Sequence, residues 1–158
     1  MSLNRTAFWF LRHGETDWNA EGRSQGHTDI PLNAVGISQA QRAALALVDC
    51  GIVTIIASPL SRALHTAEVV AEALALPVST DAGLMEVGFG VEEGQPMGDW
   101  YDSWIEGSFT PEGAESFQAL HDRAVAAINR ATAKPGPVLV VAHGALFRAL
   151  RLALGHLP

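Results

Sequence analysis

Residues Arg12, His13 and Gly14 have the types and spacing to hold an anionic group and to react with it. They follow the apolar run 7–10, which predicts a short buried strand. The guanidinium and the imidazole would then lie at the carboxyl end of a strand, where ligands bind in open α/β sheets. Gly14 allows the backbone to turn sharply and to approach a bound group closely. Alone, the triplet also fits a surface turn, so the prediction depends on partners elsewhere in the chain.

Two further apolar runs end in residues of the same chemical kind. The run 52–57 leads to Arg62, and the run 138–142 is followed directly by His143 and Gly144. Both runs predict strands buried on both faces, and parallel strands would bring all these residues to one edge of a sheet. The natural ligand of such a cationic cup is a phosphate, because arginine donors match phosphate oxygens. Gly144 would also open a helix whose first amides favour an anion.

Helices are predicted between these strands from apolar residues that recur at spacings of three and four. The expected helices cover residues 37–50, 60–74, 117–131 and 145–154, and a short strand is expected at 77–79. Residues 20–34 are typical of a loop, and the glycine-rich segment 81–115 is typical of an insert or lid near a substrate. Strands that alternate with helices predict a three-layer α/β/α sandwich with a mainly parallel sheet, in a single domain over residues 1–158.

Composition excludes several classes of protein. The chain has 158 residues, 48% of them hydrophobic, and a net charge of −7, which excludes a disordered chain and disfavours nucleic acid as a partner. No apolar run approaches the ~18 residues that span a bilayer, and no signal sequence is recognisable, so we expect a cytoplasmic protein without membrane contacts. Cys50 is the single cysteine, which excludes a disulfide within the chain, and we expect it to be a small buried residue at a helix end.

A set of short motifs, in a fixed order along nearly the whole chain, resembles the histidine phosphatase (phosphoglycerate mutase-like) superfamily. Any one motif is weak evidence, but the ordered set is strong. The motifs are Leu11–Thr16 with Trp18 and Asn19, Gln25–Leu32, Gly36 with Gln39 and Ala40, Ser58–Ala63 with Thr66 and Ala67, Leu84–Glu86, Glu93 and Gly94, Pro111–Ser116, and Val141–Gly144.

The resemblance implies a role for each matching residue. His13 would be the nucleophile that becomes phosphohistidine, and Glu86 would protonate the leaving oxygen. Three residues would surround the phosphoryl group: Arg12, Arg62 and His143. Asn19 would donate a hydrogen bond to it, and Gln25, Gly26 and Gly144 would complete the substrate site. The cup is made of Arg and His and has no carboxylate cluster suited to Mg²⁺, so we expect no metal ion and no other cofactor.

These roles agree with the chemistry of the side chains. Histidine can form a covalent phosphoryl intermediate, and it must be neutral to attack, a form that nearby arginines favour. Phosphoryl transfer depends mostly on positioning and on charge stabilisation, which Arg and protonated His can supply in place of a metal. A carboxyl beside a phosphate dianion has its pKa raised, as an acid catalyst such as Glu86 requires.

Several assignments keep an alternative. Acidic residues also occur at 81, 92, 93 and 99, so the acid role could pass from Glu86 to Glu15 or to a carboxylate in 92–99. His27 is as consistent with substrate contact as with a plain surface position. Packing of the insert is slightly favoured over a substrate shelf for Trp100, Tyr101 and Trp104. Structural roles are expected for the remaining histidines, His65, His121 and His156.

The chain departs from the family pattern at two places. The mutases carry an arginine-rich stretch just after the acid, whereas Val87–Gly90 contains no Arg or His, so the cations for a phosphoglycerate carboxylate are expected to be missing. Family members also usually continue beyond the point where Pro158 stands, so we expect an uncovered sheet edge or apolar patch.

The resulting hypothesis is a metal-independent phosphomonoesterase that acts on a small phosphorylated metabolite. A phosphoglycerate-type mutase and a non-catalytic phospho-ligand binding module are the alternatives, and a homo-oligomer is left open.

Overall fold

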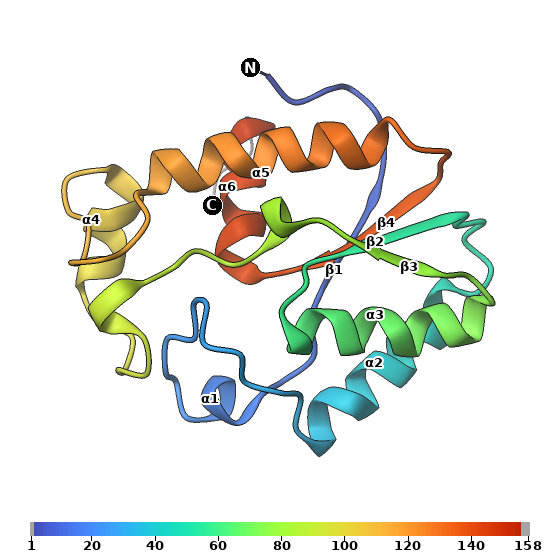
Figure 1. Ribbon diagram of the computed structural model, residues 1–158, viewed down its shortest axis with the longest axis horizontal. Helices are drawn as coiled ribbons and strands as arrows, with labels where there is room; N and C mark the ends of the chain where they lie inside the picture. The colour runs from blue at the N-terminus through green and yellow to red at the C-terminus, as the bar shows by residue number, and fades with distance from the viewer. Residues whose placement is uncertain (1, 156–158) are drawn as a thin grey trace.

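The structure is a computed structural model that describes residues 2–155, in which a four-stranded parallel sheet lies between two layers of helices (Figure 1). The sheet order is β1-β4-β2-β3, and each neighbouring pair is parallel. The strands are β1 (Trp9–Arg12), β2 (Thr54–Ala57), β3 (Val78–Thr80) and β4 (Val138–Ala142). The predicted three-layer α/β/α architecture with a parallel sheet is therefore confirmed.

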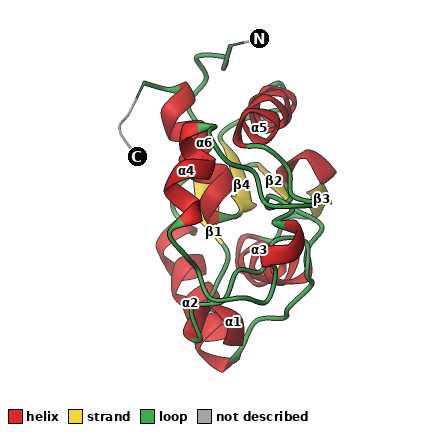
Figure 2. Cartoon of the chain, turned by 90° about the vertical axis from the view of Figure 1, so that its left-hand side faces the viewer, coloured by secondary structure: helices red, strands yellow, loops and turns green. Residues whose placement is uncertain are grey.

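Four long helices cover the two faces of the sheet. Helices α2 (Ala34–Leu47) and α3 (Ser61–Leu74) lie on one face, and α5 (Phe117–Thr132) and α6 (Gly144–Ala153) lie on the other (Figure 2). Successive side chains of a strand point to opposite faces, so each central strand supplies both cores. The core under α2 and α3 contains Ile55, Ala57, Leu139 and Val141. The core under α5 and α6 contains Ile56, Val138, Val140 and Ala142.

Capping residues shift the first helices away from their expected bounds. The helix expected over 37–50 begins at Ala34, because the Asn33 side chain accepts a hydrogen bond from the Gly36 amide at 2.8 Å. A four-residue helix, α1 (Asp17–Ala20), ends where the segment expected to be a loop begins. Its N-terminus is capped by reciprocal hydrogen bonds between Thr16 and Asn19. Apolar periodicity records only the buried face of a helix, so it does not detect such ends.

The segment 81–115 is more regular than its glycine content suggests. It contains two single 3₁₀ turns, η1 (Ala82–Leu84) and η2 (Gly90–Glu92), and the helix α4 (Trp100–Glu106). Trp104 of α4 is fully buried in the core beneath α5 and α6, with Phe89 and Phe117 against its ring. The helix therefore exists because aromatic burial orders it, a tertiary effect that a seven-residue sequence pattern does not reveal.

Backbone pairing ties this segment to the loop after α1. The Ser24 amide donates to the Gln95 carbonyl, and the Ser24 carbonyl accepts from the Gly94 amide. Next to this pair, Arg23 and Pro96 form an isolated antiparallel bridge. The expectation that residues 81–115 act as a lid stays a prediction.

Three peripheral features complete the fold. Strand β1 is an edge of the described sheet, and its Trp9 is 45% exposed. Cys50 is half-buried just beyond α2, where full burial was expected. No helix among residues 2–155 has both the length and the apolar character needed to cross a membrane.

Candidate active site

The carboxyl ends of β1, β2 and β4 meet at a cleft of about 360 Å³. Eight of the nine residues predicted for the site line it, and the ninth, His143, is fully buried beside His13 with the two ring centroids 5.2 Å apart. The eight are Arg12, His13, Asn19, Gln25, Gly26, Arg62, Glu86 and Gly144. The parallel sheet thus brings together residues that lie up to 132 positions apart, from Arg12 to Gly144.

His13 is held as a neutral imidazole, and one of its ring nitrogens has no hydrogen-bond partner among the described residues. Its Nδ1 lies 2.6 Å from the Gly14 carbonyl oxygen, which can only accept, so Nδ1 carries the proton and Nε2 keeps its lone pair. The pKa of His13 is lowered to about 3, chiefly because burial disfavours the charged ring, and Arg62 and Arg12 lower it as well. The free Nε2 has the electronic form of a nucleophile.

A serine at the end of β2 orients His143. The Leu60 amide donates to Ser58 Oγ at 3.2 Å, and that hydroxyl lies 2.8 Å from His143 Nε2. If the hydroxyl donates to Nε2, the ring proton is on Nδ1, a buried atom with no partner among the described residues. Burial lowers the pKa of His143 well below its ordinary value, so this ring is also neutral in the free protein. Ser58 was not predicted to act on the site.

Arg62 joins α3 to the loop that follows α1. Its Nη1 donates to the Thr28 carbonyl at 2.9 Å and its Nη2 to the Gly26 carbonyl at 2.7 Å. Its Nε is buried and has no partner among residues 2–155. Two of the five N–H donors of the guanidinium are thus used, and three, the Nε donor among them, remain for a ligand.

Glu93 holds the same loop from the opposite side. Its carboxylate accepts from the amides of His27, Thr28 and Phe89 and from the Thr28 hydroxyl. Gly26 adopts a φ of 58°, and a Cβ there would collide with the Glu93 carboxylate. These hydrogen bonds make Glu93 a structural acceptor and disfavour it as the alternative acid.

Hydrogen bonding also fixes which end of each amide remains for a ligand. Asn19 Oδ1 accepts from the Thr16 amide at 3.0 Å, and Gln25 Oε1 accepts from the Thr16 hydroxyl at 2.6 Å. With the oxygens occupied, the side-chain NH₂ groups of Asn19 and Gln25 are the donors available in the cleft.

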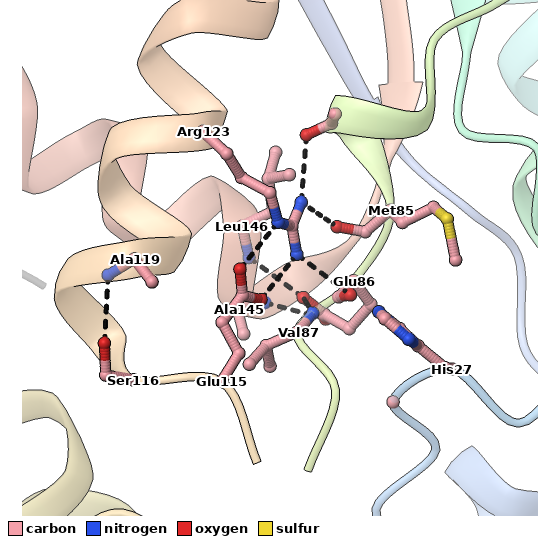
Figure 3. Close-up of polar contacts among 12 residues, drawn as sticks. His27, Met85, Glu86, Val87, Glu115, Ser116, Ala119, Arg123, Ala145 and Leu146 are labelled. Atoms are coloured by element: carbon pink, nitrogen blue, oxygen red, sulfur yellow. Dashed lines mark hydrogen bonds and ion pairs between the residues drawn. The ribbon is translucent and has the colours of Figure 1, made fainter. Parts of the chain in front are cut away.

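Glu86 binds the first turn of α6 (Figure 3). Its Oε2 accepts from the Ala145 amide at 3.0 Å, and its Oε1 accepts from the amides of Leu146 and Val87 at 3.1 Å. Burial raises the pKa of the Glu86 carboxyl, an effect that the amides and Arg62 partly oppose. The helix terminus that was expected to bind the substrate anion is therefore occupied in part by the protein's own acid, although Gly144 still lines the cleft.

Arg123 of α5 holds the backbone that carries Glu86 (Figure 3). Its Nη1 donates to the carbonyls of Gly83 and Met85 at 2.9 and 2.6 Å, and its Nη2 donates to the Glu86 carbonyl at 3.1 Å. A two-point ion pair with Glu115, at 2.8 Å, fixes the guanidinium. Sequence reasoning missed Arg123, and the available signal was its position three residues after the buried Leu120 of α5.

Two further arginines line the cleft, which corrects the expectation that extra cations are missing. The stretch after Glu86 does lack them, but Arg23 and Arg148 reach the cleft from the loop after α1 and from α6. Arg23 stacks over Trp18 at 4.0 Å and donates to the Gly94 carbonyl. Sequence reasoning could have found Arg148, because it lies four residues after Gly144 and hence on the same helix face.

The remaining candidates separate into cleft and core residues. Trp104 is fully buried, and Trp100 and Tyr101 pack against the same core, so the packing alternative holds for all three. Tyr101 also lines the cleft, and its contact with a substrate stays a prediction. His27 and His65 are exposed, His121 is half-buried, and His156 lies outside the described residues. Within residues 2–155, no three His, Cys, Asp or Glu side chains gather in a way that could hold a metal ion.

Comparison with known proteins identifies the family. The model of the histidine phosphatase superfamily (branch 1) matches residues 8–158. This chain belongs to that superfamily. A probable phosphoglycerate mutase GpmB of Proteus mirabilis is 38% identical over 163 residues, which cover 95% of this chain and 75% of the relative. An uncharacterized phosphatase PhoE of Bacillus subtilis is also 38% identical, over 92% of this chain and 75% of the relative.

Solved structures of the superfamily share the fold. A mycobacterial glucosyl-3-phosphoglycerate phosphatase in complex with VO3 matches with a TM-score of 0.84 and 32% identity, over 94% of this chain and 80% of that one. TTHB049 from Thermus thermophilus matches with a TM-score of 0.79 and 34% identity, over 94% of this chain and 85% of that one. The relatives thus support a phosphatase or a mutase, and both chemistries transfer a phosphoryl group.

Proposed function

We propose that this member of the superfamily is a phosphomonoesterase that hydrolyses a small phosphorylated metabolite through a phosphohistidine at His13. The observation that carries the proposal is the neutral His13, whose Nε2 has no partner among the described residues, in a cleft shared with Arg12, Arg62 and a carboxyl whose pKa burial raises. A nucleophile, two cations and an acid are the groups that a two-step displacement at phosphorus needs.

In the first step, the lone pair of His13 Nε2 forms a bond to phosphorus while the phosphorus–ester oxygen bond breaks. Glu86 gives its proton to the departing oxygen, and the alcohol leaves. In the second step, water attacks phosphorus, its proton passes to the Glu86 carboxylate, and the nitrogen–phosphorus bond breaks. Inorganic phosphate leaves, and both side chains return to their starting protonation states.

The charge that develops on the phosphoryl oxygens is balanced by side chains. Arg12 and Arg62 have no carboxylate within 4 Å among the described residues, so their charge is available to the ligand. The NH₂ groups of Asn19 and Gln25 would supply further hydrogen bonds. The buried His143 would add one from Nδ1 if the Ser58 hydroxyl donates to its Nε2. We therefore propose that the reaction needs no divalent metal.

A mutase is the second candidate, because one of the relatives carries that name. In that case the phosphoryl group would pass from His13 to another hydroxyl instead of to water. The presence of Arg23 and Arg148 removes the argument against it that the sequence alone provided.

The test measures release of inorganic phosphate from p-nitrophenyl phosphate and from a panel of phosphorylated metabolites, with and without EDTA. We expect turnover that EDTA does not reduce, an acid-labile phosphoryl label on the wild type, and neither turnover nor label in His13→Ala. Interconversion of 2- and 3-phosphoglycerate without phosphate release would favour the mutase, and binding without any turnover would favour a non-catalytic module. Activity that EDTA abolishes and Mg²⁺ restores would contradict metal independence.

A further inference from the structure

We propose that Ser58 is a positioning residue for the phosphoryl site, because its hydroxyl donates a hydrogen bond to His143 Nε2 and thereby places the ring proton of His143 on Nδ1. The direction of this hydrogen bond is a property of the ligand-free protein, whereas its consequence for catalysis rests on the function proposed above. The reaction derived above used the Nδ1 proton only on the condition that Ser58 donates.

The end of β4 lies between the segments that carry Ser58 and His13. The Val141 carbonyl accepts from the Ser58 amide at 3.0 Å. On the other side of the strand, the Ala142 carbonyl accepts from the His13 amide at 3.0 Å. His143 comes next in the chain, and its ring contacts both neighbours: Nε2 lies 2.8 Å from Ser58 Oγ, and the ring centroid lies 5.2 Å from that of His13.

The local sequence fixes which part of the Ser58 hydroxyl remains for His143. Pro59 restricts Ser58 to extended backbone, and the Leu60 amide then donates back to Ser58 Oγ at 3.2 Å in a serine turn. This hydrogen bond uses a lone pair of the hydroxyl and leaves its proton for an acceptor. Among residues 2–155, His143 Nε2 is the other group within hydrogen-bond distance of the hydroxyl.

The two possible directions of the hydrogen bond between Ser58 and His143 leave different numbers of polar groups without a partner. If the hydroxyl donates, the Nδ1 proton alone is unsatisfied within the described part of the chain. If Nε2 donates instead, both the hydroxyl proton and the Nδ1 lone pair lack a partner there. Both side chains are fully buried, and a buried polar group without a partner destabilises the fold, so the first direction is favoured.

A doubly protonated ring is disfavoured as well. Burial lowers the pKa of His143 well below its ordinary value, and Arg62 and the His13 ring lower it further. His143 is therefore neutral, and a neutral imidazole carries one proton, whose position follows from the hydrogen bond that the other nitrogen makes.

The assigned tautomer of His143 complements that of His13. His13 donates from Nδ1 to the Gly14 carbonyl and keeps the lone pair of Nε2, whereas His143 accepts at Nε2 and keeps the proton of Nδ1. Two neutral rings thus offer the two different groups that phosphoryl transfer needs, a lone pair for phosphorus and an N–H for a phosphoryl oxygen. In the opposite tautomer, Nδ1 of His143 would offer a lone pair, which repels phosphoryl oxygens.

Nitrogen-15 NMR of the ligand-free protein, labelled in its histidine rings, measures the tautomer directly, because protonated and bare ring nitrogens differ widely in chemical shift. The His143 signals are those that disappear in His143→Gln. We expect a proton on Nδ1 and a bare Nε2 in the wild type. The proton of free neutral histidine prefers Nε2, so Ser58→Ala should populate the Nε2–H form.

Conservative variants separate the hydroxyl from the shape of the side chain. Ser58→Thr keeps the hydroxyl and should keep the wild-type tautomer. Ser58→Cys, with a weaker donor of similar size, should keep it in part and replaces the threonine variant if that one does not fold. Ser79→Ala, at an exposed position of β3, is the matched control and should leave the His143 signals unchanged.

Steady-state rates measure the consequence for catalysis. Ser58→Ala should lower kcat by about tenfold, the lower end of the range for a hydrogen bond to a charged group. The factor should be the same for p-nitrophenyl phosphate and an alkyl phosphate, because the lost hydrogen bond goes to the phosphoryl oxygens and not to the leaving oxygen. In a His143→Gln background, Ser58→Ala should have little further effect, whereas a general weakening of the fold would lower the rate in both backgrounds.

Three results would overturn the inference: a wild-type His143 with its proton on Nε2 or on both nitrogens, a wild-type tautomer that persists in Ser58→Ala, or rate losses of Ser58→Ala and His143→Gln that multiply. If p-nitrophenyl phosphate is not hydrolysed, the proposed function fails separately. The two NMR results then judge the role of Ser58 alone.

Discussion

At the scale of single residues, one physical effect shifts the pKa of both groups that we propose to react. Burial disfavours charge, so it lowers the pKa of His13 and raises the pKa of Glu86. The shift leaves the histidine with a free lone pair and favours the protonated form of the carboxyl. Burial alone can therefore set the protonation states of the proposed nucleophile and the proposed acid.

Glu86→Gln should separate substrates by the basicity of their leaving oxygen. The amide keeps the shape of the carboxyl but cannot give a proton, so alkyl phosphates should slow by roughly 10²–10⁴-fold, the range of general acid catalysis. p-Nitrophenolate leaves without protonation, so p-nitrophenyl phosphate should slow far less. Steady-state kcat for both substrates checks this prediction, and Glu15→Gln is the control for the other carboxylate near His13. Equal losses on both substrates would assign Glu86 a positioning role.

His13 should make the folded protein sensitive to acid. Its folded-state pKa, about 3, is below the ordinary 6.5, so the unfolded chain binds more protons as the pH falls from about 6.5 towards 3. The free energy of unfolding should therefore fall with pH, and His13 alone should account for about 2 kcal/mol between pH 7 and pH 5. Glu86 acts in the opposite sense, because its raised pKa favours the folded state at low pH.

Urea unfolding of the wild type and of His13→Asn at both pH values measures that difference. The variant should lose less stability on acidification than the wild type does, and His65→Asn, at an exposed position on α3, is the matched control. An identical pH dependence in the wild type and in His13→Asn would show that His13 is not held neutral by the fold.

The site residues that could be predicted from the sequence lie next to apolar strands, whereas those that were missed act through contacts with distant segments. Arg12 ends an apolar strand, and His13 and His143 each follow one directly. These positions can be recognised from the sequence alone. Ser58 and Arg123 act through contacts with other segments, such as the bonds from Arg123 to carbonyls 37 to 40 positions away. No periodicity or spacing records a backbone carbonyl as a partner, so these contacts needed the structure.

At the scale of elements, α5 positions the acid without contacting the cleft. Arg123 gathers the carbonyls of Gly83, Met85 and Glu86 around one guanidinium, and thereby fixes the segment between η1 and Phe89 (Figure 3). Arg130 of the same helix pairs with Asp81 at 2.9 Å but is exposed, so its contribution is expected to be small.

Arg123→Met should therefore lower kcat for alkyl phosphates more than for p-nitrophenyl phosphate, because it loosens the residue that carries the proton. It should also reduce the free energy of unfolding by about 1–3 kcal/mol, since three carbonyls and Glu115 lose their partner. Arg130→Met is the matched control and should change neither quantity by much. A loss of stability with unchanged selectivity between the two substrates would leave Arg123 a purely structural residue.

Element ends were the least predictable part of the fold. The central strand β4 was expected at its observed bounds because its five residues are all apolar and buried. Helix α4 was missed, since its order depends on the burial of Trp104 against distant rings. Local sequence patterns predict an element that its own residues stabilise. They fail for an element such as α4, which is stabilised by packing against residues distant in the sequence.

At the scale of the whole molecule, the β1 edge is an exposed apolar surface. Trp9 lies on it beside an open cavity of about 580 Å³ whose lining is mostly apolar and comes from residues 6–9 and Gly136–Pro137. An unpaired strand edge with exposed aromatic surface promotes association between chains.

We therefore expect the protein to self-associate as its concentration rises. Trp9→Lys should reduce this association, because a lysine on an edge strand opposes further strand pairing. Light scattering over a concentration series measures the effect, and Val35→Lys, at an exposed position of α2, is the control. A wild type that stays monomeric at all concentrations would contradict the prediction.

The order of the strands also has a consequence for how the protein is made. β1 and β2 each hydrogen-bond to β4 and not to each other, and β4 begins only at Val138. A nascent chain that has left the ribosome as far as α5 carries His13, Arg62 and Glu86, but it lacks the strand that brings them to one edge. The reactive side chains are thus synthesised well before their cleft can form, and phosphoryl chemistry has to wait until residues 138–142 have left the ribosome and paired.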